Sequence, residues 1–198
     1  MKSWSHCMLD LETLGTRPGC AILSIGAIAF DPQSQTLGPS FYTIVGRRSC
    51  REAGLHEDRG TLAWWNRQTP EARTVLADAY SVAAPTLTDA LGQFSAFMQP
   101  FSSQTRVWGC GADFDNAILA HVYAVVGIPL PWRYTNNRCY RTLKNLVPAR
   151  EQRKRHGVHH NALDDARHQA THAMECLAYL GKLYKQDTMQ HLQASVAA

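Results

Sequence analysis

Hydrophobic residues gather in three short runs near the start of the chain, at residues 4–11, 21–30 and 41–45. Their lengths and their content of β-branched residues are typical of buried strands. Asp31-Pro32 ends the second run with a turn signal. We therefore expect these runs to form a meander, in which part of the sheet is antiparallel.

Helical periodicity dominates the chain after the third run. Thr69 before Pro70, and Thr86 three residues before Asp89, are typical helix starts. A strand is expected at 106–109, and helices are expected to begin near residues 62, 70, 87 and 115 and to cover 138–146 and 163–184. Strands followed by alternating strands and helices predict an α/β fold with a mixed sheet.

Composition narrows the class of protein. With 198 residues, of which 45% are hydrophobic and 18% charged, the chain is expected to form one soluble domain. We place this domain at 1–185 and expect a frayed tail at 186–198. We expect neither a membrane span nor a signal peptide. Six cysteines without a CxxC pair suggest reduced thiols in a cytoplasmic protein.

Asp10 and Glu12 stand at the end of the first predicted strand. Because side chains alternate along a strand, both carboxylates point to one face, with their Cα atoms about 7 Å apart. Such charges repel each other, and a hard divalent cation such as Mg²⁺ would hold them together through its oxygen ligands. A bare pair of this kind fits an exposed strand end better, so the metal hypothesis depends on further acids.

Two later helices each offer a pair of candidate acids. Asp115 falls within the apolar stripe of its helix, whereas Asp113 falls roughly opposite and fits a cap or a solvated acid. In the last helix, Asp165 lies on the flank of the apolar stripe and could reach a cleft. Asp164 points away from the stripe and sits at the third position of a helix that Asn161 can cap.

Four histidines accompany the last predicted helix. His159 and His160 precede it, and either could accept a proton from water near neutral pH, but periodicity does not say which one faces the site. His168 and His172 have the i, i+4 spacing of metal ligands. Since they lie opposite the apolar stripe, we expect both to face solvent.

Together these residues resemble the three motifs of the DEDDh (DnaQ-like) 3′–5′ exonucleases, which are related to polymerase proofreading subunits, ribonuclease T and oligoribonuclease. The matching residues, in chain order, are Asp10-Leu11-Glu12-Thr13, Phe114-Asp115, and His160 followed by Asp165. Residues 10–32, 62–65 and 108–109 look closest to a phage and bacterial subgroup of exodeoxyribonuclease VIII-like and small exoribonuclease-like proteins. The resemblance covers residues 5–180.

The resemblance implies an RNase H-like fold, in which helices flank a mixed five-stranded sheet. It implies two Mg²⁺ or Mn²⁺ ions held by four carboxylates, which here are Asp10, Glu12, Asp115 and Asp165. The family spacing His-x4-Asp makes His160 the general base rather than His159. The implied substrate is single-stranded RNA or DNA with a free 3′ end, cut to 5′-nucleoside monophosphates, and a homodimer is expected because relatives often form one.

Candidate substrate contacts come partly from the resemblance. Relatives use the position of Thr13 and Leu14 to contact the terminal nucleotide. Trp64 or Trp65 could stack on a base, because aromatic faces bind single strands without sequence preference. One tryptophan of an adjacent pair is expected in the core, and the sequence does not say which.

Basic residues gather at 133–155, where a single glutamate opposes eight lysines and arginines. Such an excess beside an acidic site suits a polyanionic substrate, although 150–155 fits a solvated loop equally well. Arg138 and Arg141 are candidate phosphate contacts, and Lys144 could join them on the same helix. Gly111-Ala112-Asp113 departs from relatives, many of which carry an amide or a histidine before the second motif.

Two other functions remain open. The fold could bind nucleic acid without chemistry, although a pure binder gains nothing from four acids facing phosphate. An RNase H-like endonuclease could use a similar acid set, and only an endonuclease would cut a circular substrate. RNA and DNA are not distinguished, because that choice depends on contacts with the 2′-hydroxyl group.

Overall fold

A mixed five-stranded sheet forms the centre of the computed structural model, which describes residues 4–148 and 157–197. The strands lie in the order β3-β2-β1-β4-β5, with β2 antiparallel to both β1 and β3, and with β4 parallel to both β1 and β5. Their bounds are β1 His6–Thr13, β2 Ile22–Asp31, β3 Thr36–Ile44, β4 Arg106–Gly109 and β5 Asn137–Cys139. The predicted meander and mixed sheet are both confirmed.

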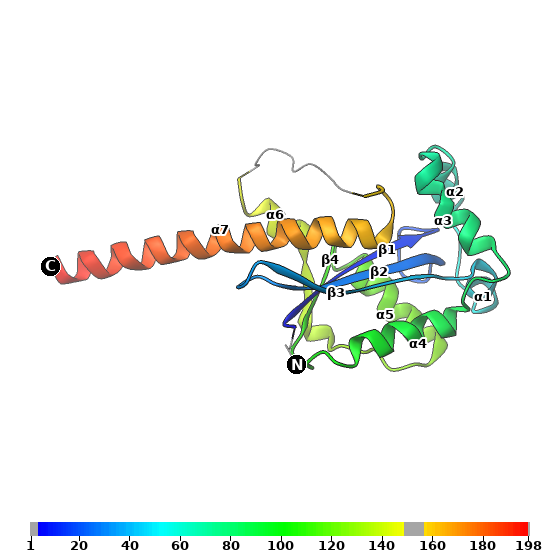
Figure 1. The fold of residues 1–198 in the computed structure, drawn as a ribbon, viewed down its shortest axis with the longest axis horizontal. Helices are drawn as coiled ribbons and strands as arrows, with labels where there is room; N and C mark the ends of the chain where they lie inside the picture. The colour runs from blue at the N-terminus through cyan, green and yellow to red at the C-terminus, as the bar shows by residue number, and fades with distance from the viewer. Residues whose placement is uncertain (1–3, 149–156, 198) are drawn as a thin grey trace.

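Helices cover both faces of this sheet (Figure 1). In the view of Figure 1, α7 runs above the sheet while α4 and α5 lie below it. The helices are α1 Arg47–Glu52, α2 Arg59–Trp65, α3 Pro70–Tyr80, α4 Leu87–Met98, α5 Asp115–Val126, α6 Tyr140–Asn145 and α7 Ala162–Ala197, with a 3₁₀ turn η1 at Tyr134–Asn136. As expected, Thr69 and Thr86 cap α3 and α4, because each side chain accepts a backbone N–H three residues on.

Each face of β1 packs against a different core. Leu9 and Leu11 belong to the cluster formed with α4 and α5, whereas Met8 belongs to the cluster formed with α7. Alternation along the strand therefore puts Asp10 and Glu12 on the α7 face. All eight residues of β1 are buried, so these carboxylates do not lie at an exposed strand end.

Small residues let α7 approach the sheet closely. Its contact stripe is built from alanines, including Ala162, Ala166 and Ala170. Gly26, which pairs with Asp10 across β1 and β2, lies directly beneath the first turn of the helix. A Cβ atom at Gly26 would stand 2.2 Å from the carbonyl carbon of Ala162, so only glycine permits this contact.

The structure differs from the prediction in three places. β5 and η1 occupy 134–139, so α6 begins at Tyr140 rather than near 138, because β5 is held as a strand by pairing with β4. The segment 46–60, where no helix is predicted, contains α1 and the start of α2. Instead of ending near Tyr184, α7 continues to Ala197. The single domain at 1–185 stays a prediction.

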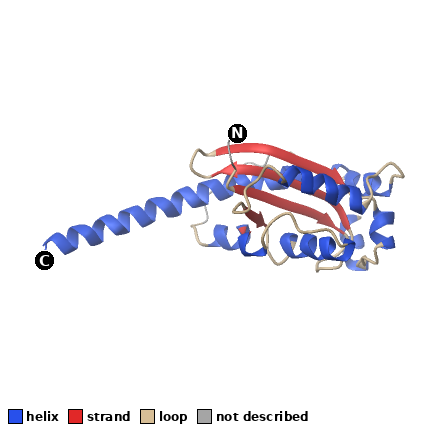
Figure 2. Cartoon of the chain, turned by 90° about the horizontal axis from the view of Figure 1, so that it is seen from below, coloured by secondary structure: helices blue, strands red, loops and turns tan. Residues whose placement is uncertain are grey.

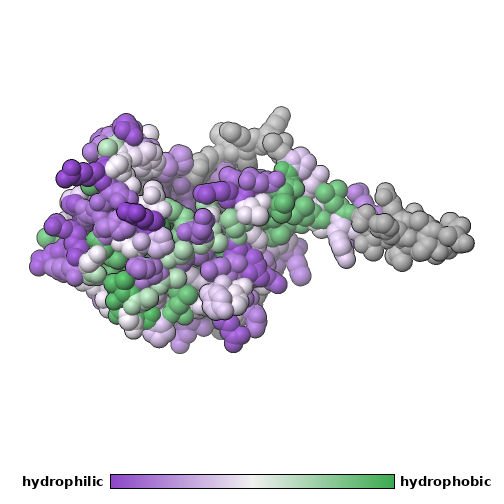
Figure 3. Space-filling view, turned by 180° about the vertical axis from the view of Figure 1, so that it is seen from behind, coloured by the Kyte–Doolittle hydropathy of each residue, from purple (hydrophilic) through white to green (hydrophobic). Residues whose placement is uncertain are grey.

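The distal half of α7 projects beyond the sheet (Figures 1 and 2). Figure 3 shows hydrophobic residues where the helix leaves the body of the protein. Leu183, which belongs to α7, is 44% exposed. In the described part of the chain, no helix combines the length and the apolar character that crossing a bilayer requires.

Candidate active site

Four acids converge on a cavity of about 730 Å³ at the end of β1. Asp10 and Glu12 come from β1, Asp115 begins α5, and Asp165 lies in the first turn of α7. Their exposed fractions lie between 2% and 8%. Carboxylate oxygens of Asp10, Glu12 and Asp165 lie within 4.8 Å of one another. The structure thus brings together all four carboxylates that the sequence singled out.

Asp115 is fixed by the backbone around it. One of its oxygens accepts the N–H of Leu11 at 3.1 Å, and the other accepts the N–H of Cys110 at 2.8 Å. Gly109 makes room for it, because a Cβ atom there would stand 2.9 Å from the Cβ atom of Asp115. These contacts join the start of α5 to the ends of β1 and β4.

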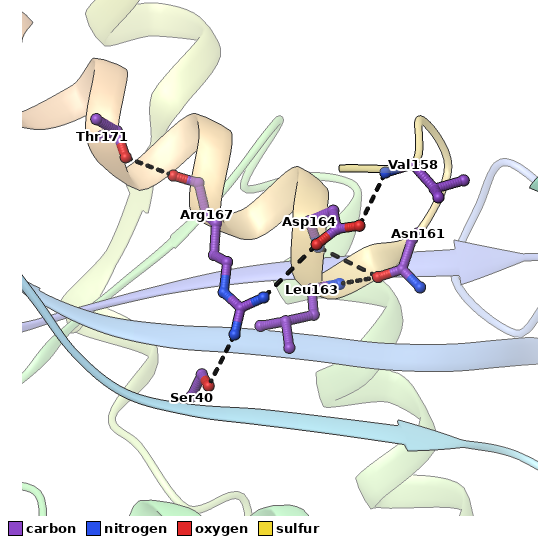
Figure 4. Close-up of polar contacts among 7 residues, drawn as sticks. All are labelled: Ser40, Val158, Asn161, Leu163, Asp164, Arg167 and Thr171. Carbon is purple, nitrogen blue, oxygen red and sulfur yellow. Dashed lines mark hydrogen bonds and ion pairs between the residues drawn. The ribbon is translucent and has the colours of Figure 1, made fainter. Parts of the chain in front are cut away.

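The start of α7 is held by its own cap (Figure 4). The side-chain oxygen of Asn161 accepts the N–H groups of Leu163 and Asp164, which confirms the expected capping. Asp164 accepts the N–H of Val158 and lies near Arg167, so it stabilises the turn before the helix. Asp164 therefore has the structural role predicted for it, and Asp165 is left to face the cavity.

Gln169 is a site residue that the sequence reasoning missed. Its Nε2 donates to Oδ1 of Asp10 at 2.6 Å, and the side chain lines the cavity. It lies four residues after Asp165, on the same face of α7. That spacing was the signal that could have found it.

Burial and mutual repulsion raise the pKa values of these acids. Burial raises the pKa of Asp10 well above its ordinary value, and the carboxylates of Asp115, Glu12 and Asp165 raise it further. Burial raises the pKa of Asp115 to about 7, although the hydrogen bonds from Leu11 and Cys110 oppose this change. A buried cluster of like charges needs a counter-charge, and oxygen-only donors suit a hard divalent cation. The residues therefore fit a divalent metal site.

His160 lies at the rim of the cavity in a left-handed backbone conformation, with φ of 64°. Its N–H donates to Oδ2 of Asp165 at 3.3 Å. The centroid of its ring lies 4.7 Å from that of Trp64, edge to face, and 3.8 Å from that of His159, which stacks on it. Both histidines of the pair thus line the cavity, beside Asp165.

The other two histidines lie elsewhere than predicted. His168 lines the cavity, and Nδ1 of His172 forms a 2.7 Å hydrogen bond with the hydroxyl group of Tyr140. The expectation that both face solvent is wrong, because α6 packs against this side of α7. The periodicity of α7 alone could not reveal that neighbour.

The predicted substrate contacts near β1 and α2 divide into two groups. Thr13 and Trp64 line the cavity. Leu14 is 0% exposed in the core and does not line it. Trp65 touches the cavity but is 1% exposed, and its Nε1 donates to the carbonyl oxygen of Thr13 at 2.9 Å. Trp65 is therefore the core member of the pair, and Trp64 is the one placed to meet a ligand.

The basic residues divide in the same way. Arg141 and Lys144 line the cavity, and Arg141 donates to the carbonyl oxygen of Cys110 at 2.7 Å. Arg138 is not among the lining residues, because its guanidinium is bound to the carbonyl oxygens of Thr135 and Asn137. The segment 150–155 lies outside the described residues.

A family model described as the 3′-5′ exoribonuclease Rv2179c-like domain matches residues 5–177. The chain belongs to this family. The match contains all four acids and His160, and it confirms the resemblance to DEDDh exonucleases.

A curated relative, the exodeoxyribonuclease of Enterobacteria phage T4, is 29% identical to this exoribonuclease-like domain over 124 residues. The alignment covers 57% of this chain and 52% of the relative, so the chain spans about half the length of that protein.

Solved structures share the fold of this Rv2179c-like domain at low sequence identity. The nuclease domain of 3′hExo, a DEDDh family member bound to rAMP, has a TM-score of 0.58 at 13% identity, covering 88% of this chain and 92% of that one. E. coli exonuclease I in complex with a dT13 oligonucleotide has a TM-score of 0.64 at 13% identity, covering 93% and 43%. These likenesses confirm the predicted RNase H-like architecture.

Proposed function

We propose that this protein is a metal-dependent 3′–5′ exonuclease that hydrolyses single-stranded nucleic acid to 5′-nucleoside monophosphates. The observation that carries the proposal is the convergence of four buried carboxylates and His160 on one cavity. Membership of a 3′-5′ exoribonuclease-like family supports the same reaction.

The four carboxylates, Asp10, Glu12, Asp115 and Asp165, would hold two divalent cations, Mg²⁺ or Mn²⁺. When bound, such ions stabilise charge on the attacking and leaving oxygens of a phosphodiester and lower the pKa of a bound water. Gln169 orients Asp10 through its hydrogen bond, and backbone N–H groups orient Asp115. The protein thus fixes the ligands before any substrate arrives.

His160 would accept the proton of the attacking water at a ring nitrogen. Its main chain is tied to Asp165, so the base and one of the metal ligands move together. Exchanging His160 for glutamine should lower kcat by about 10²–10⁴-fold, the usual share of general-base catalysis. Single-turnover rates, with His121→Gln as a control on the exposed face of α5, would measure this loss.

The cavity walls would bind the end of the strand. Trp64 offers a ring on which a terminal base can stack, and Thr13 also lines the cavity. Arg141 and Lys144 also line the cavity and would contact phosphate oxygens. Family likeness does not separate RNA from DNA, because one similar protein is named an exodeoxyribonuclease and the family is described as exoribonucleases.

A paired digestion tests the proposal. A 5′-labelled single-stranded RNA and the matching DNA are incubated with the enzyme and Mg²⁺ or Mn²⁺, with Asp10→Ala as the control. The expected result is a ladder that shortens from the 3′ end and is absent from the control. Cleavage of a circular strand would instead identify an endonuclease, and retained binding without cleavage would identify a non-catalytic binder.

The expected homodimer stays a prediction. Light scattering of the purified protein would give the mass of the species in solution.

A further inference from the structure

Two histidines and an aspartate form a second set of metal-binding atoms at the rim of the cavity. One nitrogen from each of His159 and His160 and one oxygen of Asp165 all lie within 4.8 Å of one another. The carboxylates of Asp10, Glu12, Asp115 and Asp165 form the floor of the cavity. The second set differs from this floor in chemistry, because two of its three donors are imidazole nitrogens. Asp165 belongs to both sets.

We propose that His159, His160 and Asp165 bind Zn²⁺ and that the bound ion inhibits the enzyme. Zinc is typically held by histidine nitrogen and carboxylate oxygen, with three protein ligands and a water in open sites. Imidazole suits zinc and the later transition metals, whereas magnesium and manganese prefer carboxylate and water. The set that contains two imidazoles should therefore prefer zinc to magnesium and manganese.

The local backbone holds the two imidazole rings side by side. The left-handed conformation of His160 lets the two neighbouring imidazoles stack, with an angle of 22° between their planes, so both rings lie on one side of the loop. Trp64 packs against the ring of His160, while His159 is exposed and can turn without repacking any core. Because the lone pair of an imidazole nitrogen lies in the plane of its ring, His159 must turn out of the stack before all three donor atoms can reach the distances of about 2.0–2.2 Å that zinc requires.

The inhibition follows from the shared residues, and this half of the inference rests on the proposed exonuclease function. A nitrogen of His160 that is bound to zinc cannot accept a proton from water. Asp165 drawn toward zinc is also withdrawn from the carboxylate floor. Zinc would therefore block catalysis at concentrations far below those of magnesium, by occupying a site that includes a residue with no proposed catalytic role, His159.

Zinc binding is measured first, without reference to activity. Metal-free full-length protein competes with a metallochromic indicator for Zn²⁺, and wild type is compared with His159→Asn and with His121→Asn, an exposed histidine on α5. His159→Asn should weaken zinc binding at least tenfold, and His121→Asn should not change it. Asp10→Asn should keep tight zinc binding, because it alters only the carboxylate floor. Equal zinc affinities of wild type and His159→Asn would overturn the proposal.

Inhibition is measured second, as the zinc concentration that halves the magnesium-supported rate of each protein relative to its own zinc-free rate. This concentration should rise at least tenfold in His159→Asn and stay at the wild-type value in His121→Asn. The same concentration in all three proteins would overturn the inhibitory half. If wild type does not cleave nucleic acid at all, the exonuclease proposal fails, while the binding titration still decides whether the zinc site exists.

Discussion

The floor and the rim of the cavity are held in place by different means. The floor carboxylates stand on β1, α5 and α7. Gln169 binds Asp10, and backbone N–H groups bind Asp115 and Asp165. The rim side chains, Trp64, His159 and Lys144, come from short helices and a turn and are more exposed. The floor is therefore part of the fold, while His159 and Lys144 on the rim are exposed and can vary without disturbing the core.

This difference predicts different effects of substitution in the two regions. A change on the floor should affect turnover and stability together, since the same buried contacts serve both. A change on the rim should affect substrate binding and leave the fold intact.

Asp10→Asn should have the largest effect on activity, lowering kcat/KM by at least about 10³-fold. The reason is the loss of a ligand whose cations supply several kcal/mol of charge stabilisation. Steady-state rates of wild type and Asp10→Asn in saturating Mg²⁺ measure this loss. A loss below tenfold would show that the floor does not carry the chemistry.

Gly26→Ala should displace the floor carboxylates relative to one another although it replaces none of them. Its Cβ atom would meet the backbone of Ala162, so α7 must shift and carry Asp165 away from Asp10. We expect a loss of about 1–3 kcal/mol in the free energy of unfolding and about 10²-fold in kcat. Gly92→Ala in α4, where nothing lies within 4 Å, is the control and should leave both unchanged or improved.

The stability of the metal-free protein should reveal the repulsion on the floor. Because the folded-state pKa of Asp10 is raised, its stabilising contribution is complete below about pH 4 and is lost as the pH rises. Asp10→Asn cannot ionise, so its advantage over wild type should be small at pH 4 and should grow toward pH 7. Denaturant unfolding in a chelator measures this difference. Added Mg²⁺ should stabilise wild type and remove the advantage of Asp10→Asn. If the difference in stability between the two proteins did not depend on pH, repulsion at Asp10 would not be its cause.

Arg141→Ala should have the smallest effect, raising KM by about tenfold with little change in stability. The loss of one phosphate contact should also reduce the salt dependence of binding. Arg138→Ala is the matched control from the same basic segment, since its guanidinium is bound to backbone carbonyl groups outside the cavity. If Arg141→Ala and Arg138→Ala raised KM equally, Arg141 would not contact phosphate in preference to Arg138.

The sequence predicted the floor better than the rim. Alternation along β1 and the helical stripes of α5 and α7 identified the four acids, because these patterns follow from regular backbone geometry. The roles of Leu14 and Trp65 were not predictable, since burial there depends on how α2 packs against the end of β1. Arg138 was misplaced for a similar reason, because β5 is a three-residue strand defined only by its pairing with β4.

Gly26 and Gly109 also escaped notice in the sequence, where a glycine inside a strand pattern usually suggests a bulge. Each instead leaves room for a neighbouring chain segment, one for the start of α7 and one for Asp115. A designer who transplanted this site to another α/β scaffold would have to copy two missing methyl groups together with four acids and a histidine. The spacing of the charges is set as much by atoms that are absent as by those that are present.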